Sequence, residues 1–141
     1  MSDRLSDEDM SALFKEAETI AIVGLSDDPR RDSYRVASYL QSQGYTIIPI
    51  NPMIRESLGQ KAYTSLRDYG KPVDIVNVFR KSEAVDAIVD DVIAIGIKVL
   101  WTQLGIVNAS AAKKAKSASI TVVMDRCIAV EHRRLLAHVA L

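Results

Sequence analysis

The sequence predicts an α/β protein in which a doubly wound, mainly parallel sheet is covered by helices on both faces. Short apolar runs, such as TIAIV at 19–23 and VDIVNVF at 73–79, alternate with stretches whose apolar residues recur at helical spacing. The apolar runs are nearly continuous, which is typical of strands buried on both faces. Strands that alternate with helices pair in parallel, and right-handed crossovers then favour a doubly wound sheet.

The first half of the chain is predicted to hold two helices and two strands. Ser6 and Asp9 resemble a capping box, and apolar residues follow at helical spacing, so residues 7–18 should form a helix. An apolar run bounded by Gly24 predicts a strand at 19–23. Residues 34–43 have helical character and stop at Gly44, a natural C-terminal cap. A second strand should follow at 45–50.

The second half should continue this alternation. We predict strands at 73–79, 97–101 and 120–124, and helices at 82–95, 109–117 and 130–139. Gly96 is suited to close the first of these helices. The sheet would have five strands, or six if a short extended piece at 61–63 joins it. With no internal repeat or linker, residues 1–141 are predicted to form one domain, against which the helix within 1–18 packs.

The composition argues against several classes of function. Lys and Arg together number 18, as do Asp and Glu, and this balance argues against broad binding to nucleic acid or to a membrane surface. The single cysteine excludes an intramolecular disulfide and a thiolate metal cage. The start of the sequence is acidic, unlike a secretory signal, and no apolar run approaches the roughly 20 residues that span a bilayer. We therefore expect a cytoplasmic protein.

In a sheet of this class, ligands bind beyond the carboxyl ends of the strands, so the loops there hold the candidate site. The first loop offers a glycine that lets the backbone approach a ligand closely, a hydroxyl and two arginines; its candidate residues are Gly24, Leu25, Ser26, Arg30 and Arg31. Backbone amides at a helix start bind phosphate, and the planar guanidinium group binds phosphate through two hydrogen bonds. The alternative is a solvated turn whose charges cancel.

The second loop discriminates between nucleotides. A dinucleotide dehydrogenase places an acidic residue about 20 residues beyond its glycines, to accept from the adenosine ribose. Here the neutral Asn51, followed by Pro52, takes that position. A carboxylate would repel a phosphorylated ribose, whereas asparagine does not. NAD is therefore disfavoured and NADP remains open.

Further candidate residues follow the third and fourth strands. Phe79 and Arg80 come after the third strand, and Arg80 either binds phosphate or pairs with Glu83. After the fourth strand we expect ligand contacts from Gln103 and the amides around Gly105. Trp101 is a candidate for the same edge, although packing in the core is the alternative for a tryptophan here.

Cys127 and the two histidines are the candidates for catalytic and metal-binding roles. Cys127 follows Arg126 and precedes His132 by five residues, and a nearby cation favours a thiolate. A free cysteine is nevertheless most often a small apolar residue, and we prefer that interpretation. His132 and His138 are six residues apart, unlike a metal-binding pair on one helical face. We predict no catalytic residue and no metal site.

Taken in order, the segments VGLSDDPRRDSYRVASYLQSQGY, IIPINP, VDIVNVFRKSE, WTQLGIVN and VVMDRC resemble the small bacterial CoA-binding protein family. Its members are single-domain, Rossmann-like proteins related to the CoA-binding domain of the succinyl-CoA synthetase α subunit. The resemblance implies that coenzyme A crosses the carboxyl edge of the sheet. Its phosphates would lie at residues 24–26 with Arg30 or Arg31, its adenosine near Asn51 and Pro52, and its remainder past Phe79 and Arg80 toward residues 101–105.

The sequence therefore predicts a protein that binds coenzyme A or an acyl-CoA, most plainly as a non-catalytic sensor, carrier or regulatory module. The first alternative is an NADP-dependent oxidoreductase or another enzyme that uses nucleotides. The second is a receiver-like interaction domain, although Asp74 lies at the start of a predicted strand, where a receiver's acidic pocket does not form. The apolar ending LLAHVAL is also compatible with a homodimer.

Overall fold

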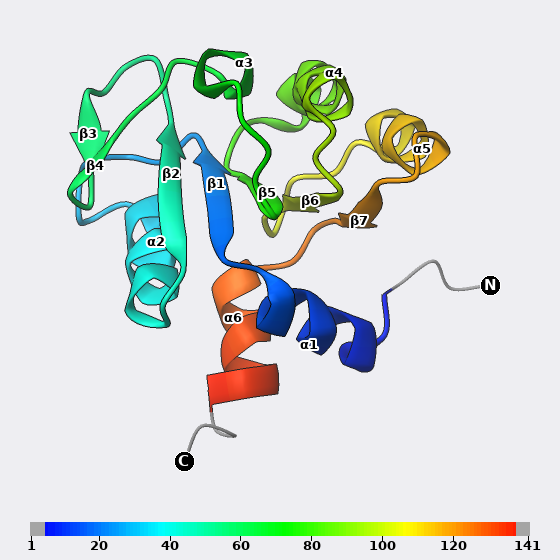
Figure 1. Ribbon diagram of the computed structural model, residues 1–141, viewed down its shortest axis with the longest axis horizontal. Helices are drawn as coiled ribbons and strands as arrows, with labels where there is room; N and C mark the ends of the chain where they lie inside the picture. Colours follow the sequence, from blue (N-terminus) through cyan, green and yellow to red (C-terminus); the bar gives the residue numbers. More distant parts are fainter. Residues whose placement is uncertain (1–4, 138–141) are drawn as a thin grey trace.

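The structure is a computed structural model that describes residues 5–137. Its central sheet consists of five parallel strands, β1 (Thr19–Val23), β2 (Thr46–Ile50), β5 (Ile75–Val78), β6 (Val99–Thr102) and β7 (Thr121–Val123). They are ordered β2-β1-β5-β6-β7 (Figure 1). The order reverses between β1 and β5, and the crevice beyond this switch point is where ligands bind in doubly wound sheets. The predicted fold class is confirmed.

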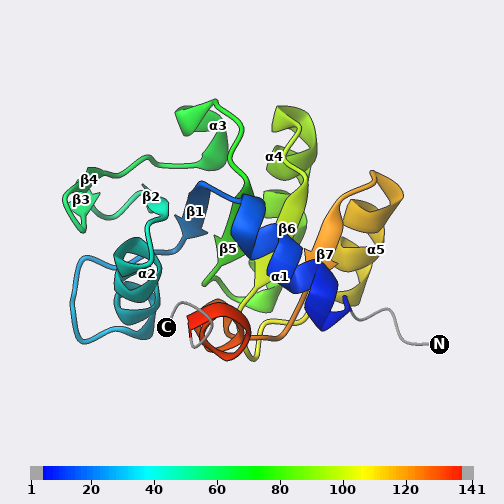
Figure 2. The same cartoon turned by 60° about the horizontal axis from the view of Figure 1, so that its bottom comes forward.

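Helices cover both faces of this sheet. One face carries α1 (Asp7–Glu16), α2 (Asp32–Ser42) and α6 (Ile128–His132), which continues as a π-helical turn, Arg133–Ala137. The other carries α3 (Leu66–Tyr69), α4 (Val85–Ile95) and α5 (Ala109–Ser117), with a 3₁₀ turn, Ser82–Ala84, leading into α4. Figure 2 shows α1 and α6 lying next to each other on their shared face.

The local signals in the sequence account for most helix ends. The Ser6 hydroxyl oxygen accepts from the Asp9 amide at 3.1 Å, so α1 begins where the capping pattern places it, although it ends at Glu16, two residues early. Gly96 closes α4 in a left-handed conformation, as predicted. The helix expected at 34–43 begins at Asp32 instead, because its N-cap residue carries no side-chain cap and so gives no signal.

The stretch between β2 and α3 forms a small hairpin rather than a sixth strand. β3 (Glu56–Ser57) pairs with β4 (Gln60–Lys61) in a separate two-stranded sheet. Tyr63, from the extended piece expected at 61–63, makes only an isolated parallel bridge with Ile50. This segment covers the outer edge of β2, next to the carboxyl edge of the main sheet.

The last helix starts earlier than predicted and is oriented differently. It begins at Ile128 rather than at residue 130, and Val130 is 54% exposed instead of contributing to the expected apolar face. Leu135 and Leu136 do pack against the core, whereas residues 138 and 139 lie outside the described range. None of the helices in residues 5–137 is both long and apolar enough to cross a membrane.

His132 lies within an aromatic cluster between α1, α2 and α6. Its Nδ1 is 2.8 Å from the Tyr39 hydroxyl oxygen, and its ring makes edge contacts with Phe14 and Tyr45 at centroid distances of 5.1 and 5.6 Å. The imidazole is 4% exposed. This burial lowers the pKa of His132 below its usual value, and the neighbouring charge of Arg133 lowers it further.

This pKa shift predicts a loss of stability in mild acid. The unfolded chain binds a proton at its histidine near pH 6.5, whereas folded His132 stays neutral to lower pH. The contribution of His132 to the free energy of unfolding is therefore complete above about pH 6.5 and decreases as the pH falls below it. Urea titrations between pH 8 and 5 should show this decrease in the native protein and a flatter profile in His132→Gln. Equal profiles would contradict the prediction.

Candidate binding site

Two cavities of opposite character meet at the carboxyl end of β1. The first, called here the polar pocket, has a volume of about 500 Å³ and is lined by Gly24, Ser26, Arg30, Arg31, Asp32, Ser33 and Phe79. The second, the apolar pocket, has a volume of about 280 Å³ and is lined by Val23, Gly24, Ile50, Pro52, Thr64, Ser65, Leu66, Arg80, Ala84, Ala87, Ile88 and Asp91. Gly24 lines both, so they adjoin at the switch point of the sheet.

Gly24 allows the loops after β1 and β5 to come together. Its φ is +93°, and a Cβ atom there would lie 2.7 Å from the carbonyl oxygen of Phe79 and 3.0 Å from Cδ of Arg80. Its amide donates to the carbonyl of Ile50 at 2.8 Å. The close approach expected at this glycine is thus an approach to protein backbone, and it sets the positions of Phe79 and Arg80 at the two pockets.

The rest of the first loop is held by side chains from neighbouring elements. The Ser26 amide donates to the Ser33 hydroxyl at 3.0 Å, and the Ser26 carbonyl accepts from the Ser57 hydroxyl at 2.9 Å. The Leu25 carbonyl accepts from the Asn51 side-chain amide at 2.9 Å, while the Leu25 side chain is fully buried. Leu25 and Asn51 therefore shape the loop, and the amide of Ser26 is already bonded within the protein.

The two arginines of the loop differ. Arg30 donates to both carboxylate oxygens of Asp28 at 3.1 Å, and these hydrogen bonds lower the pKa of Asp28. The guanidinium of Arg31, by contrast, makes no hydrogen bond or ion pair within residues 5–137. Arg31 is also the N-cap of α2, whose first-turn amides lack partners within the helix. Arg31 and this helix start are thus the readiest phosphate-binding groups of the polar pocket.

The polar pocket also contains a carboxylate. Asp32 lines it and forms an ion pair with Arg35. Because Arg35 balances that charge and Asp28 balances the charge of Arg30, the guanidinium of Arg31 leaves the pocket favourable to an anion.

The apolar pocket lies between α4, the start of α3 and the ends of β1 and β2. Ala84, Ala87 and Ile88 form its wall on α4, and Pro52 comes from the loop after β2. Arg80 lines the pocket beside Gly24, within reach of the polar pocket's edge. Small and branched apolar side chains around a narrow space suit a flat, weakly polar group.

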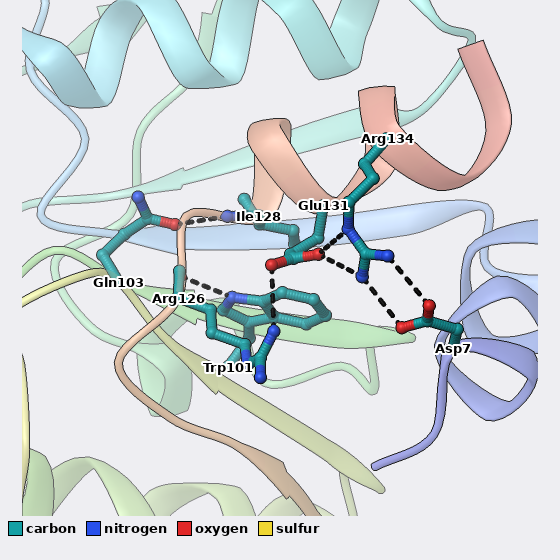
Figure 3. Close-up of polar contacts among 7 residues, drawn as sticks. All are labelled: Asp7, Trp101, Gln103, Arg126, Ile128, Glu131 and Arg134. Carbon is teal, nitrogen blue, oxygen red and sulfur yellow. Dashed lines mark hydrogen bonds and ion pairs between the residues drawn. The ribbon is translucent and has the colours of Figure 1, made fainter. Parts of the chain in front are cut away.

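The structure corrects the expected roles of Trp101 and Gln103. Trp101 has no exposed surface: its indole N–H donates to the Arg126 carbonyl at 2.8 Å and its ring packs on Phe14. The Gln103 side-chain oxygen accepts from the amide of Ile128 at 2.9 Å (Figure 3) and from the side-chain amide of Asn77 at 3.2 Å. Trp101 therefore belongs to the core, and Gln103 anchors the start of α6.

Gly105 does lie at the exposed carboxyl edge. Its amide donates to the Asp125 carboxylate at 2.6 Å, and the Asp125 amide donates to the Thr102 hydroxyl at 3.1 Å. These bonds join the loops after β6 and β7. Next to Gly105, Leu104 is 71% exposed, which leaves an apolar side chain at the edge of the sheet.

Beyond these loops, an ion-pair network ties α6 to α1 (Figure 3). Glu131, which is 8% exposed, accepts from Arg126 Nη1 at 3.0 Å and from Arg134 Nε and Nη2 at 2.8 and 2.6 Å. Arg134 also binds both carboxylate oxygens of Asp7 at 2.9 Å. Sequence reasoning missed this network because Asp7 and Arg134 are 127 positions apart.

The network bears on Cys127, the candidate nucleophile. Arg126 is bonded to Glu131, and His132 is bonded to Tyr39. The two residues that the sequence offers for activation of Cys127 thus have other partners. Within residues 5–137, no group of three or more His, Cys, Asp and Glu side chains could hold a metal ion.

Asp74 has a structural role at the opposite, amino edge of the sheet. Its carboxylate accepts from the amides of Glu18 and Thr19 at 2.7 and 3.0 Å and from the Thr19 hydroxyl at 3.2 Å. Burial raises the pKa of Asp74, but the hydrogen bonds outweigh burial and the net pKa is lowered. This position, far from the carboxyl edge, is unlike that of an acidic residue in a receiver pocket.

Two known proteins resemble this chain over most of its length. YneT of Bacillus subtilis (strain 168) is 43% identical over 124 residues, 88% of this chain and 92% of that protein. A solved Thermus thermophilus structure, cell-free ID.343, is 40% identical with a TM-score of 0.90, covering 94% of this chain and 100% of that one.

A more distant similarity is to part of a larger enzyme. The dinucleotide-forming acetyl-coenzyme A synthetase 1 of Ca. Korarchaeum cryptofilum is 26% identical with a TM-score of 0.67, over 81% of this chain and 27% of that one. The family described as CoA binding domain matches residues 18–133, most of the chain. On this match and on the fold that it shares with these relatives, the protein belongs to the CoA binding domain family.

Proposed function

We propose that the protein binds coenzyme A or an acyl-CoA across the carboxyl edge of its sheet, as a non-catalytic sensor, carrier or regulatory module. The observation that carries this proposal is the pair of adjoining pockets, one polar and one apolar, that share Gly24. Coenzyme A has matching parts, a multiply charged phosphate portion beside a nucleobase. The family match supports a CoA-related ligand.

The polar pocket would hold phosphate groups. Arg31 would donate to phosphate oxygens, and the first-turn amides of α2 would add further donors. Arg30 would contribute after exchanging its bonds with Asp28, an exposed pair of the kind that costs little to break. The nucleobase would lie in the apolar pocket, beside Pro52 and Arg80. The arm would extend over Phe79 toward the exposed edge at Leu104 and Gly105.

The non-catalytic part of the proposal follows from the surroundings of Cys127. Its neighbours Arg126 and His132 are engaged by Glu131 and Tyr39 and do not form an acid–base pair with it. No contact described above favours the NADP-dependent or receiver-like alternatives. A cytoplasmic location and a homodimer stay predictions.

Calorimetric and thermal-shift titrations with CoA, acetyl-CoA, NAD and NADP in parallel test the ligand class. A ligand that binds only the native state stabilises it by about 2.7 kcal/mol at a hundredfold excess over its dissociation constant. We expect CoA or acetyl-CoA to raise the melting temperature and NAD to leave it unchanged. A response to NAD alone would overturn the proposal.

The two arginines should differ in their contribution to CoA binding. Arg31→Ala removes an unpaired guanidinium and is expected to weaken binding about 10- to 100-fold, the equivalent of a charged hydrogen bond of roughly 1.5–3 kcal/mol. Arg30→Ala should have a smaller effect, because Arg30 must first leave Asp28. The double variant should also show a flatter salt dependence.

Lys98→Ala provides the matched control, since it removes one positive charge near the opposite edge of the sheet, where Lys98 lies beside Asp74 in a separate cavity. CoA affinity measured by calorimetry should be the same in this variant and in the native protein. Equal affinity in Arg31→Ala, Arg30→Ala and Lys98→Ala would remove the phosphate assignment.

A further inference from the structure

We propose that Asp91 makes the apolar pocket selective for a purine that carries an exocyclic amino group over one with a carbonyl group in its place. This inference rests on the proposed function and adds to it the residue that reads the base. Asp91 is one of the charged residues in an otherwise largely apolar lining, and its position within the pocket indicates what it recognises.

The position of Asp91 follows from the face that α4 presents. Ala84, Ala87, Ile88 and Asp91 all line the pocket, and their spacing of three, four and seven residues places them along one side of a helix. Ala84 follows the loop of Arg80, next to the polar pocket, and Asp91 lies about two turns farther along. A base whose phosphates occupy the polar pocket would therefore point its far edge toward Asp91.

An ion pair holds the Asp91 carboxylate in place, but within residues 5–137 only one of its two oxygens accepts a hydrogen bond. Arg67, on α3, donates through Nε to Oδ1 of Asp91 at 2.5 Å, an ion pair that bridges the two helices. The side chain of Asp91 is 24% exposed. Its second oxygen, Oδ2, accepts no hydrogen bond within the described residues. A fixed carboxylate oxygen is thus available beside an apolar surface.

The chemistry of this oxygen gives the selectivity. An ionised carboxylate only accepts hydrogen bonds, so it pairs with an amino N–H and repels a carbonyl oxygen. Ser65 also lines the pocket; its hydroxyl oxygen accepts from the Asp68 amide at 3.0 Å, which leaves its O–H free to donate to a ring nitrogen. A site built on such bonds discriminates strongly, because the wrong group leaves polar atoms unpaired.

Calorimetry with adenosine 3′,5′-bisphosphate and its inosine counterpart tests the inference. The native protein should bind the adenine compound at least tenfold more tightly. In Asp91→Asn the carboxamide can donate to the carbonyl of hypoxanthine, so the preference should fall to about twofold or less. Asp90→Asn, the matched control on the same helix, removes an exposed carboxylate that pairs with Lys114 outside the pocket and should keep the native preference.

The outcomes separate this inference from the proposed function. If the native protein binds both compounds equally, or if Asp91→Asn keeps the full native preference, the role of Asp91 is wrong while the CoA site stands. If neither compound nor CoA binds, the proposed function itself fails. If the melting curve of Asp91→Asn shows that this variant does not fold, Asp91→Ser replaces it in the experiment. Asp91→Ser also removes the carboxylate, and we expect it to lose the preference for the adenine compound to the same extent.

Discussion

Replacement of Gly24 by alanine is expected to destabilise the protein by about 2–5 kcal/mol and to weaken CoA binding markedly. An L-residue in the left-handed region costs roughly 1–2 kcal/mol, and forcing an extra methyl group into a packed site costs roughly 1–3 kcal/mol. Both penalties apply, because φ is +93° and the new Cβ would lie 2.7 Å from the Phe79 carbonyl oxygen. Because this carbonyl belongs to the backbone, the clash is removed only if the loop that contains Phe79 and Arg80 moves.

Gly44→Ala is the matched control. Gly44 has a φ of +99°, but no atom lies within 4 Å of the position that a Cβ would take there, so this variant bears the cost of the backbone conformation alone. Urea denaturation should rank Gly24→Ala as the less stable of the two, and only Gly24→Ala should lose CoA affinity. Equal stability and equal affinity in both variants would show that the contact with Phe79 has no energetic weight.

Replacement of Glu131 by alanine is expected to have the second large effect, about 2–4 kcal/mol of stability. Removing one partner of a buried ion pair costs roughly 3–5 kcal/mol, and the partial exposure of the arginines reduces that value here. Glu131 is 8% exposed and accepts from Arg126 and Arg134 at once, so its loss leaves Arg126, whose side chain is 23% exposed, without its carboxylate. Glu131→Gln, which keeps the shape, should lose less.

The exposed ion pair between Asp86 and Lys114 provides the control for the Glu131 variant. Asp86 binds Lys114 at 2.7 Å with 57% of its side chain exposed, and Lys114 keeps Asp90 when Asp86 is replaced. Asp86→Asn should therefore change the free energy of unfolding by less than about 1 kcal/mol, as is usual for surface pairs. The prediction for Glu131 fails if denaturant midpoints show the two variants to be equally stable.

The fold was predictable because its signals are local. Five apolar runs identify the five strands, and their alternation with helical stretches determines the parallel pairing. Gly96 ends α4 as its residue type indicates. The start of α2 was placed two residues late because Arg31, its N-cap, provides no side-chain hydrogen bond. An N-cap without a capping side chain has no sequence signature.

The site was predictable only in part. Four of the five first-loop residues, all but Leu25, do gather around one pocket, because they follow a single strand and lead into a single helix. Leu25 is buried in the core instead. For Trp101 the sequence left two alternatives, a ligand contact or the core; the structure shows the core, because Trp101 lies within β6, which runs to Thr102, and its side chain is buried. Asp91 gave no signal at all, since a carboxylate in mid-helix usually faces solvent and only the packing of α3 on α4 brings it to a cavity.

The first loop also has a consequence for the thermodynamics of association. Its carbonyls and the Ser26 amide are fastened by Asn51, Ser57 and Ser33 before any ligand arrives. A segment that is already immobile loses little conformational entropy when a ligand binds. Less of the favourable interaction energy is then offset, and the affinity is higher. In that sense Ser57, which lines neither pocket, still helps to determine how tightly the bound molecule is retained.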